Sequence, residues 1–166
     1  MSALYFITGS EGVGKSSIIC FLKKQFPKKQ IHDFDEVGVP ENPQLQWRYD
    51  TTLHWIRAAI NNQIKSRSTI IAGLSFPDEV SKFKEHKKVD KIFFCLLDVH
   101  EEEREKRLCK RNASKEVIED LEQLHQLRRK FKTTKFENKI IDTTNLSVKE
   151  TADKVIDWII NCEIEK

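Results

Sequence analysis

Residues 9–16 read Gly9-Ser10-Glu11-Gly12-Val13-Gly14-Lys15-Ser16, and this stretch decides the fold. It matches the pattern G-x-x-x-x-G-K-[ST] at every fixed position, directly after an apolar run and directly before a segment with helical spacing. The glycines let the backbone curl so that successive N–H groups point at one phosphate group, and the following helix adds positive potential there. The stretch therefore predicts a strand, a phosphate-binding loop and a helix.

The rest of the chain alternates short β-branched or aromatic runs with longer segments of helical period, which is typical of a parallel α/β sheet. We expect five strands, near residues 4–8, 30–34, 69–72, 91–97 and 139–142. A capping box from Ser147 to Glu150 predicts the start of the last helix. Apolar stripes predict that two helices pack on the sheet through Tyr49, Leu53, Ile56, Ile60 and Ile64, and through Val148, Ala152, Val155, Ile156 and Ile159.

Composition limits the classes of function. The 166 residues fit one domain, and 29 basic residues against 26 acidic ones give a formal charge of +3. This balance indicates neither nucleic-acid nor membrane binding, and no apolar run approaches the roughly 20 residues that span a bilayer. The four cysteines form no C-x-x-C pair, so we expect a reduced, cytoplasmic protein. Oligomeric state cannot be read from the sequence.

The loop chemistry predicts ATP and Mg²⁺ as cofactors. Lys15 would reach the β- and γ-phosphates, and the Ser16 hydroxyl would take one position on Mg²⁺. The residues expected to bind the nucleotide here are Gly9, Ser10, Glu11, Gly12, Val13, Gly14, Lys15, Ser16 and Ser17.

A GTPase is not favoured. Residues 35–38 do match D-x-x-G, but they follow the loop too soon for the usual switch region. Residues 138–142 read Asn-Lys-Ile-Ile-Asp and have one residue too many for N-K-x-D. Short motifs of this kind match often by accident.

Four features together resemble the nucleoside monophosphate kinase and shikimate or gluconate kinase group, over nearly the whole chain. The first is the early phosphate-binding loop, and the second is Asp33-Phe34-Asp35, which is similar to the D-x-D of shikimate kinases. The third is the stretch from Arg107 to Arg111, which is similar to the R-x-x-x-R that begins the lid in this group. The fourth is the turn at residues 140–146, which borders the adenine in this group.

The resemblance implies a three-layer P-loop NTPase fold, with a five-stranded parallel sheet in the order 2-3-1-4-5 and helices on both faces. It implies one kinase-like domain over residues 1–166, an acceptor-binding segment at about residues 35–66 and a short lid at about residues 104–116. The chain departs from the group after the third strand. Residues 72–79 lack the leading carboxylate and the following arginine of D-G-[FY]-P-R, so Asp33 becomes the candidate acidic partner of Mg²⁺, through water.

Charged residues near the strand ends are candidates for the acceptor and for catalysis. Asp35 would lie on the same side of the strand as Asp33 and could take the proton of a hydroxyl acceptor. Positive charge for the transferred group would come from Lys15, Arg107 and Arg111. The resemblance further implies acceptor contacts from Arg48, Arg57 and Gly73, and a nucleotide contact from Arg128.

The sequence therefore predicts an ATP-dependent phosphotransferase that acts on a small molecule. The acceptor is left open between a hydroxyl metabolite and a nucleotide. The alternative is an ATP- or ADP-binding regulatory protein, or a weak ATPase, without a small-molecule acceptor.

Overall fold

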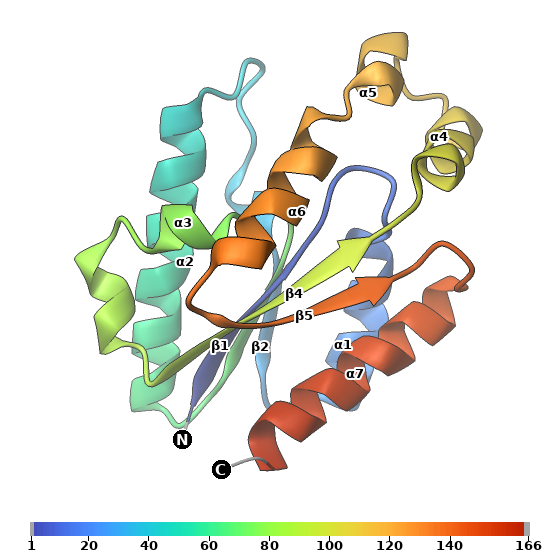
Figure 1. Ribbon diagram of the computed structural model, residues 1–166. Coiled ribbons are helices and arrows are strands. Elements are labelled where there is room, and N and C mark those ends of the chain that lie inside the picture. The colour runs from blue at the N-terminus through green and yellow to red at the C-terminus, as the bar shows by residue number, and fades with distance from the viewer. Residues whose placement is uncertain (1, 165–166) are drawn as a thin grey trace.

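One parallel sheet forms the centre of the molecule in the computed structural model, which describes residues 2–164 (Figure 1). Its strand order is β2-β3-β1-β4-β5, which confirms the predicted order 2-3-1-4-5. The strands are β1 (Ala3–Thr8), β2 (Gln30–Asp33), β3 (Thr69–Ala72), β4 (Lys91–Asp98) and β5 (Glu137–Asp142). The three inner strands are almost continuously buried, as expected when helices cover both faces.

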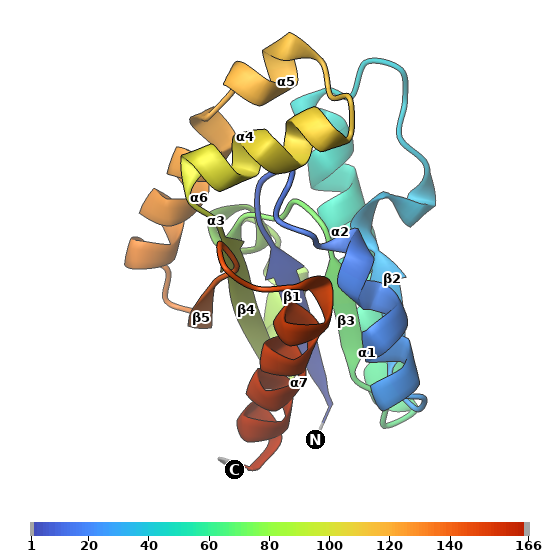
Figure 2. The ribbon, with the colours of Figure 1, turned by 90° about the vertical axis from the view of Figure 1, so that its right-hand side faces the viewer.

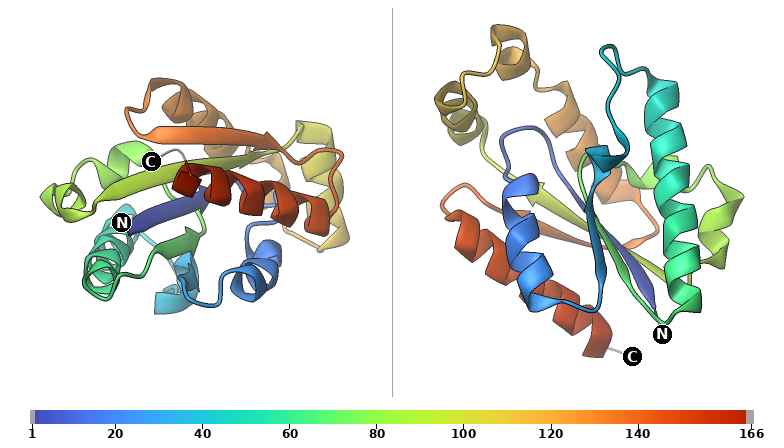
Figure 3. Two further views of the ribbon diagram at one scale, coloured as in Figure 1. Left: turned by 90° about the horizontal axis from the view of Figure 1, so that it is seen from below. Right: turned by 180° about the vertical axis from the view of Figure 1, so that it is seen from behind.

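Helices form a layer on each face of the sheet (Figure 3). On one face, α1 (Ile19–Gln25) and α7 (Val148–Ile164) enclose a core around Tyr5, Ile7 and Cys95. On the other face, α2 (Leu45–Ile64), α3 (Pro77–Val80) and α6 (Glu122–Thr133) enclose a core that includes Phe6, Phe94 and other buried side chains. The three-layer α/β fold is therefore confirmed.

Two further helices, α4 (Glu101–Lys110) and α5 (Lys115–Glu119), extend beyond the carboxyl ends of the strands. Figure 2 shows them above the loop that follows β1. Short 3₁₀ turns complete the chain, namely η1 (Ser16–Ile18), η2 (Phe34–Val37) and η3 (Lys84–Lys88). Among the described residues, no helix has the length and apolar character that a membrane crossing requires.

The buried face of α2 differs from the predicted stripe. Ile56 is buried, but Ile64 is 79% exposed and Leu53 is only half-buried. The helix instead packs through Thr51, Thr52, Trp55, Ile56 and Ala59. The prediction failed because the stripe left out Trp55, whose indole fills the core and donates to the carbonyl oxygen of Phe34 at 3.0 Å.

The capping box of α7 is confirmed in both directions. The backbone N–H of Ser147 donates to Oε2 of Glu150 at 2.8 Å, and the N–H of Glu150 donates to Oγ of Ser147 at 3.2 Å. Val148 lies at the first position of the helix and is 45% exposed, so its predicted place in the core is wrong. Ala152, Val155 and Ile159 are buried as predicted, and Ile156 packs at the edge of the same core.

We expect Ser147→Ala to lower the free energy of unfolding by about 1 kcal/mol, because one amide at the start of α7 loses its acceptor. The measurement is urea denaturation followed by circular dichroism. Lys154→Ala is the matched control, since Lys154 is exposed on the same helix, and it should leave the free energy of unfolding nearly unchanged. Equal effects of the two substitutions would contradict the capping role.

Candidate active site

The phosphate-binding loop from Gly9 to Lys15, which we call the P-loop, has the conformation that its glycines predict. Gly12 and Gly14 have φ values of 87° and 96°, in the left-handed region that residues with a side chain rarely adopt. The chain then turns into η1 and α1, so this loop opens a helical segment. Backbone N–H groups at such a position attract phosphate.

Lys15 is the last residue of this loop, and its side chain folds back to the start of the loop. Its Nζ donates to the carbonyl oxygens of Gly9 and Ser10, at 2.7 and 2.8 Å. Burial lowers the pKa of Lys15 to about 8, although the carboxylates of Glu11, Asp35 and Asp33 act in the opposite direction. The ammonium group is thus held against the loop and is easier to deprotonate than an ordinary lysine.

Ser16 and Asp33 form a direct pair. The Ser16 hydroxyl donates to Oδ2 of Asp33 at 2.7 Å, across the gap between the loop and the end of β2. A hydroxyl and a carboxylate are hard oxygen ligands that suit Mg²⁺, which commonly keeps several waters and takes its other ligands from phosphates. No group of three or more His, Cys, Asp or Glu side chains within residues 2–164 could hold a metal ion by itself. The residues present therefore fit a magnesium ion shared with a nucleotide.

Asp35 does not reach its position in the way that the sequence predicted. The strand ends at Asp33, one residue earlier than expected, and Asp35 lies in η2, so the two carboxylates do not follow strand alternation. Oδ1 of Asp33 instead caps the turn by accepting the N–H of Asp35 at 3.0 Å. Burial and the nearby Asp33 carboxylate raise the pKa of Asp35, which makes it a better proton acceptor.

A cavity of about 580 Å³ opens beside these carboxylates; we call it the Asp35 cavity. It lies between the P-loop, η2, the start of α2, the end of β3 and α6. Its lining residues are Glu11, Lys15, Ser16, Asp33, Phe34, Asp35, Val39, Pro43, Gln44, Leu45, Trp47, Arg48, Gly73, Leu74, Gln123 and Gln126.

Gly73, which lines this cavity, lies where the backbone packs too closely for a side chain. A Cβ atom at residue 73 would lie 2.1 Å from Cβ of Phe34, a distance that no side chain allows. The N–H of Gly73 donates to the carbonyl oxygen of Ile7 at 3.0 Å, so β3 and β1 stay aligned up to the cavity floor.

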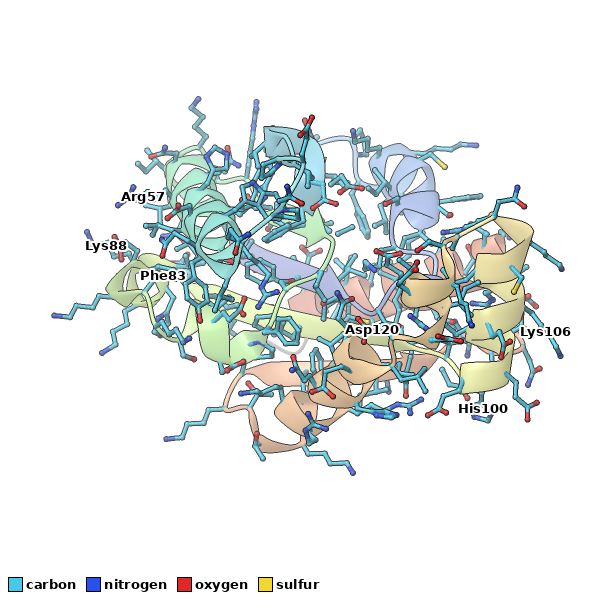
Figure 4. All side chains as sticks on the ribbon, turned by 90° about the horizontal axis from the view of Figure 1, so that it is seen from above. Arg57, Phe83, Lys88, His100, Lys106 and Asp120 are labelled. Carbon is cyan, nitrogen blue, oxygen red and sulfur yellow. The ribbon has the colours of Figure 1, made fainter. Side chains whose placement is uncertain are left out.

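The two arginines of α2 lie in different places. Arg48 lines the Asp35 cavity and binds the carboxylate of Glu79 through Nε and Nη2, with a shortest distance of 2.6 Å. Arg57 is exposed and pairs with Glu85 at 3.3 Å, near Phe83 and Lys88 in Figure 4. Because Arg57 does not line the Asp35 cavity, we leave it out of the proposed site.

A second cavity of about 350 Å³ lies on the other side of the loop; we call it the Arg107 cavity. It is lined by Gly12, Val13, Gly14, Ser17, Ile18, Glu103, Arg107, Lys110, Arg111, Leu146, Ser147, Val148 and Thr151. The loop thus divides the two cavities. Both arginines of the R-x-x-x-R pattern belong to this second cavity.

The guanidinium groups of Arg107 and Arg111 differ in how firmly the protein holds them. Arg107 donates to Oε1 of Glu103 at 3.0 Å and to the carbonyl oxygen of Thr143 at 2.6 Å, so its guanidinium joins α4 to the turn before α7. Arg111 is exposed at the end of α4, and its guanidinium makes no hydrogen bond or ion pair with the described residues. It is also close enough to Lys15 to lower that group's pKa further.

Arg128 has a structural partner. Its Nε donates to both carboxylate oxygens of Asp98 at 3.1 Å, and its Nη2 donates to the carbonyl oxygen of Val99 at 3.0 Å. It lines neither cavity. We therefore leave Arg128 out of the proposed nucleotide contacts.

Sequence reasoning missed two residues, Glu79, which binds Arg48, and Arg104. Arg104 is only 3% exposed, and its guanidinium donates to the carbonyl oxygens of Val117, Ile118 and Asp120 at 2.9–3.0 Å. It therefore fixes α5 against α4. Nothing in the spacing of the sequence distinguishes this buried cation from its exposed neighbours, because its acceptors are backbone atoms that only the fold brings near.

Comparison with known proteins supports the fold. No family model and no curated protein sequence matches the chain. A sugar kinase from Janibacter sp. HTCC2649 has a TM-score of 0.66 at 13% identity, covering 96% of this chain and 95% of that one. The YorR protein of Bacillus subtilis, solved with phosphorylated GDP, has a TM-score of 0.62 at 20% identity, covering 98% of each chain. Shikimate kinase from Aquifex aeolicus has a TM-score of 0.61 at 12% identity, covering 98% and 99%. The fold is therefore that of the P-loop kinases.

The lowered pKa of Lys15 predicts how nucleotide affinity depends on pH. Bound phosphates favour the charged lysine, so binding takes up a proton wherever the unbound protein has lost it, which is above pH of about 8. We expect the dissociation constant for ADP, measured in EDTA by calorimetry, to rise from pH 8 to pH 10 by up to about tenfold per unit. Lys15→Ala should bind weakly at every pH, and Lys23→Ala, an exposed control, should behave as wild type. A constant affinity over this range in the wild type would contradict the assignment.

Arg104→Met should loosen α5 without unfolding the sheet. The substitution keeps the apolar stem of the side chain but removes the hydrogen bonds of the charged guanidinium, which contribute about 2 kcal/mol. Amide hydrogen exchange at residues 115–120 should therefore become roughly 30-fold faster. Lys106→Met is the control, since Lys106 is an exposed residue of the same helix (Figure 4). Unchanged exchange in Arg104→Met would show that α5 is held by other contacts.

Proposed function

We propose that this protein transfers the γ-phosphoryl group of ATP to a small molecule bound in the Asp35 cavity. The observation that carries the proposal is the position of the P-loop between two cavities. Residues 12–14 and 17 line the Arg107 cavity, while residues 11, 15 and 16 line the Asp35 cavity. A nucleotide held in the first cavity would thus direct its terminal phosphate across Lys15 toward the second.

The nucleotide would be held by the loop and by the arginines of α4. Backbone N–H groups of the loop and Lys15 would contact the β- and γ-phosphates. Hydrogen bonds to Thr143 hold Arg107 in the wall of the Arg107 cavity, so its guanidinium would contact the nucleotide without changing position. Arg111 has no competing partner among the described residues and could reach the transferred group.

Mg²⁺ would be held by Ser16 and, through water, by Asp33. When bound, it neutralises negative charge that develops on the phosphate oxygens. Asp33 also caps η2 through its other oxygen, so one side chain both serves the metal site and fixes the backbone of Asp35.

In the proposed reaction, the acceptor oxygen forms a bond to the γ-phosphorus while the bond from that phosphorus to the β–γ bridging oxygen breaks. ADP leaves with the bridging oxygen, and the hydroxyl proton passes to the carboxylate of Asp35. The raised pKa of Asp35 favours that proton transfer. The role of Asp35 is thus to orient the hydroxyl and to take its proton.

The alternative hypothesis, a nucleotide-binding regulatory protein or weak ATPase, offers no reason for a cavity of about 580 Å³ beside Lys15 and Asp35. The two functions are separated by incubating the protein with MgATP and a pool of metabolites, then searching for a phosphorylated compound by mass spectrometry. ADP formation that needs no added compound, with no phosphorylated product, would favour the ATPase.

The two aspartates should fail in different ways. Asp35→Asn should lower kcat by about 10²- to 10⁴-fold and leave ATP affinity nearly normal, because it removes a base and not a phosphate contact. Asp33→Asn should instead raise the Mg²⁺ concentration needed for half-maximal activity. The measurements are steady-state kinetics and an Mg²⁺ titration of each variant. Normal activity in both variants would exclude this site from the reaction.

A further inference from the structure

The charge balance of the Asp35 cavity points to the chemistry of the acceptor. The cations that line the cavity are Lys15 and Arg48, whereas three carboxylates line it, those of Glu11, Asp33 and Asp35. In the proposed function, Lys15 is committed to the phosphates of ATP. Among the described residues that line the cavity, Arg48 is therefore the cation left to bind a negatively charged acceptor.

Arg48 is already neutralised. Its Nε lies 3.1 and 3.0 Å from the two carboxylate oxygens of Glu79, and its Nη2 lies 2.6 Å from Oε1. The side chain of Glu79 is 6% exposed, and the guanidinium also lies over the ring of Phe76, 4.9 Å from the centroid. A phosphate or carboxylate that bound the Nε and Nη2 groups of Arg48 would have to displace Glu79 and leave a buried carboxylate without its partner, which is strongly unfavourable. One that bound Nη1 would meet a guanidinium whose charge Glu79 already balances.

The other groups of the cavity suit an uncharged molecule. The amides of Gln44, Gln123 and Gln126 offer hydrogen-bond donors and acceptors without charge. Apolar side chains contribute much of the rest of the wall, and two of them at its rim, Val39 and Leu45, are 49% and 51% exposed. An acceptor with an apolar face would cover them.

We propose that the acceptor is an uncharged hydroxyl compound with an apolar face, and that Glu79 excludes phosphorylated or carboxylated analogues by neutralising Arg48. This inference rests on the proposed phosphotransfer and narrows its substrate class. Arg48 keeps its Nη1 group without an acceptor among the described residues, so it can still donate a hydrogen bond to a neutral oxygen. Glu79 is a specificity-determining residue in this proposal, because it acts through Arg48.

The first test measures binding of sulfate, which resembles phosphate in charge and cannot accept a phosphoryl group. Saturating MgADP fills the P-loop, and calorimetry then measures sulfate binding. We expect Glu79→Gln to bind sulfate at least tenfold more tightly than wild type, because it releases the charge of Arg48. The double variant Glu79→Gln/Arg48→Gln should return to the wild-type value.

The chain offers a matched control for this test. Arg57 and Glu85 form a second Arg–Glu pair that involves the same helix, outside the Asp35 cavity. Glu85→Gln releases an arginine in the same way and should leave sulfate affinity unchanged. The proposal is overturned if wild type binds sulfate as tightly as Glu79→Gln, or if the gain persists in the double variant.

The second test measures transfer from MgATP to matched pairs of compounds. Nucleosides are paired with their 5′-monophosphates, and hexoses with the corresponding sugar acids. For any pair that is phosphorylated, we expect kcat/KM to be at least tenfold higher for the uncharged member, and a preference for the anionic member overturns the inference. If no compound is phosphorylated, the proposed function fails, while the sulfate result still decides whether Glu79 neutralises the cavity.

Discussion

The position of β1 between β3 and β4 is the constraint on which the site depends. Parallel pairing aligns Ile7 with Ala72 on one side and Thr8 with Leu96 on the other. The P-loop therefore leaves β1 between the ends of two neighbouring strands, and β2 ends close enough for Asp33 to meet Ser16. Ligands of open α/β sheets bind at this edge because the strand ends and the following loops converge there.

Local sequence patterns predicted the helices and strands well. They could not predict which distant residues a side chain contacts in the folded protein. The P-loop, the strands and the Ser147–Glu150 capping box follow from residues that interact over short stretches of sequence, so the chain alone carries the signal. The place of Asp35 was harder, because a side-chain cap from Asp33 ended the strand before alternation could reach it. The partners of Arg48 and Arg104 come from other parts of the fold, and no spacing rule indicates them.

Most of the arginines near the site are held by the protein itself. Arg104 joins α4 to α5, Arg107 joins α4 to the turn before α7, and Arg128 joins α6 to the end of β4. These contacts order the segment above the P-loop through interactions within the chain. Lids in many kinases close over the substrate during turnover. Here such contacts hold α4 and α5 in place, whereas the guanidinium of Arg111 has no partner among the described residues and is free to move.

The hydrogen bonds of Lys15 to its own loop limit how much affinity for phosphate this side chain can add. Gly9 and Ser10 already accept hydrogen bonds from the ammonium group of Lys15, which has three N–H donors, so a phosphate that takes over either of these bonds exchanges one oxygen acceptor for another. For such a bond, the free energy gained is the difference between an anionic phosphate acceptor and a neutral carbonyl acceptor, rather than the full strength of a new hydrogen bond. Small changes in the curvature of the loop would shift that difference in either direction. Phosphate affinity could therefore drift during evolution while Lys15, Asp33 and Asp35 remain the same.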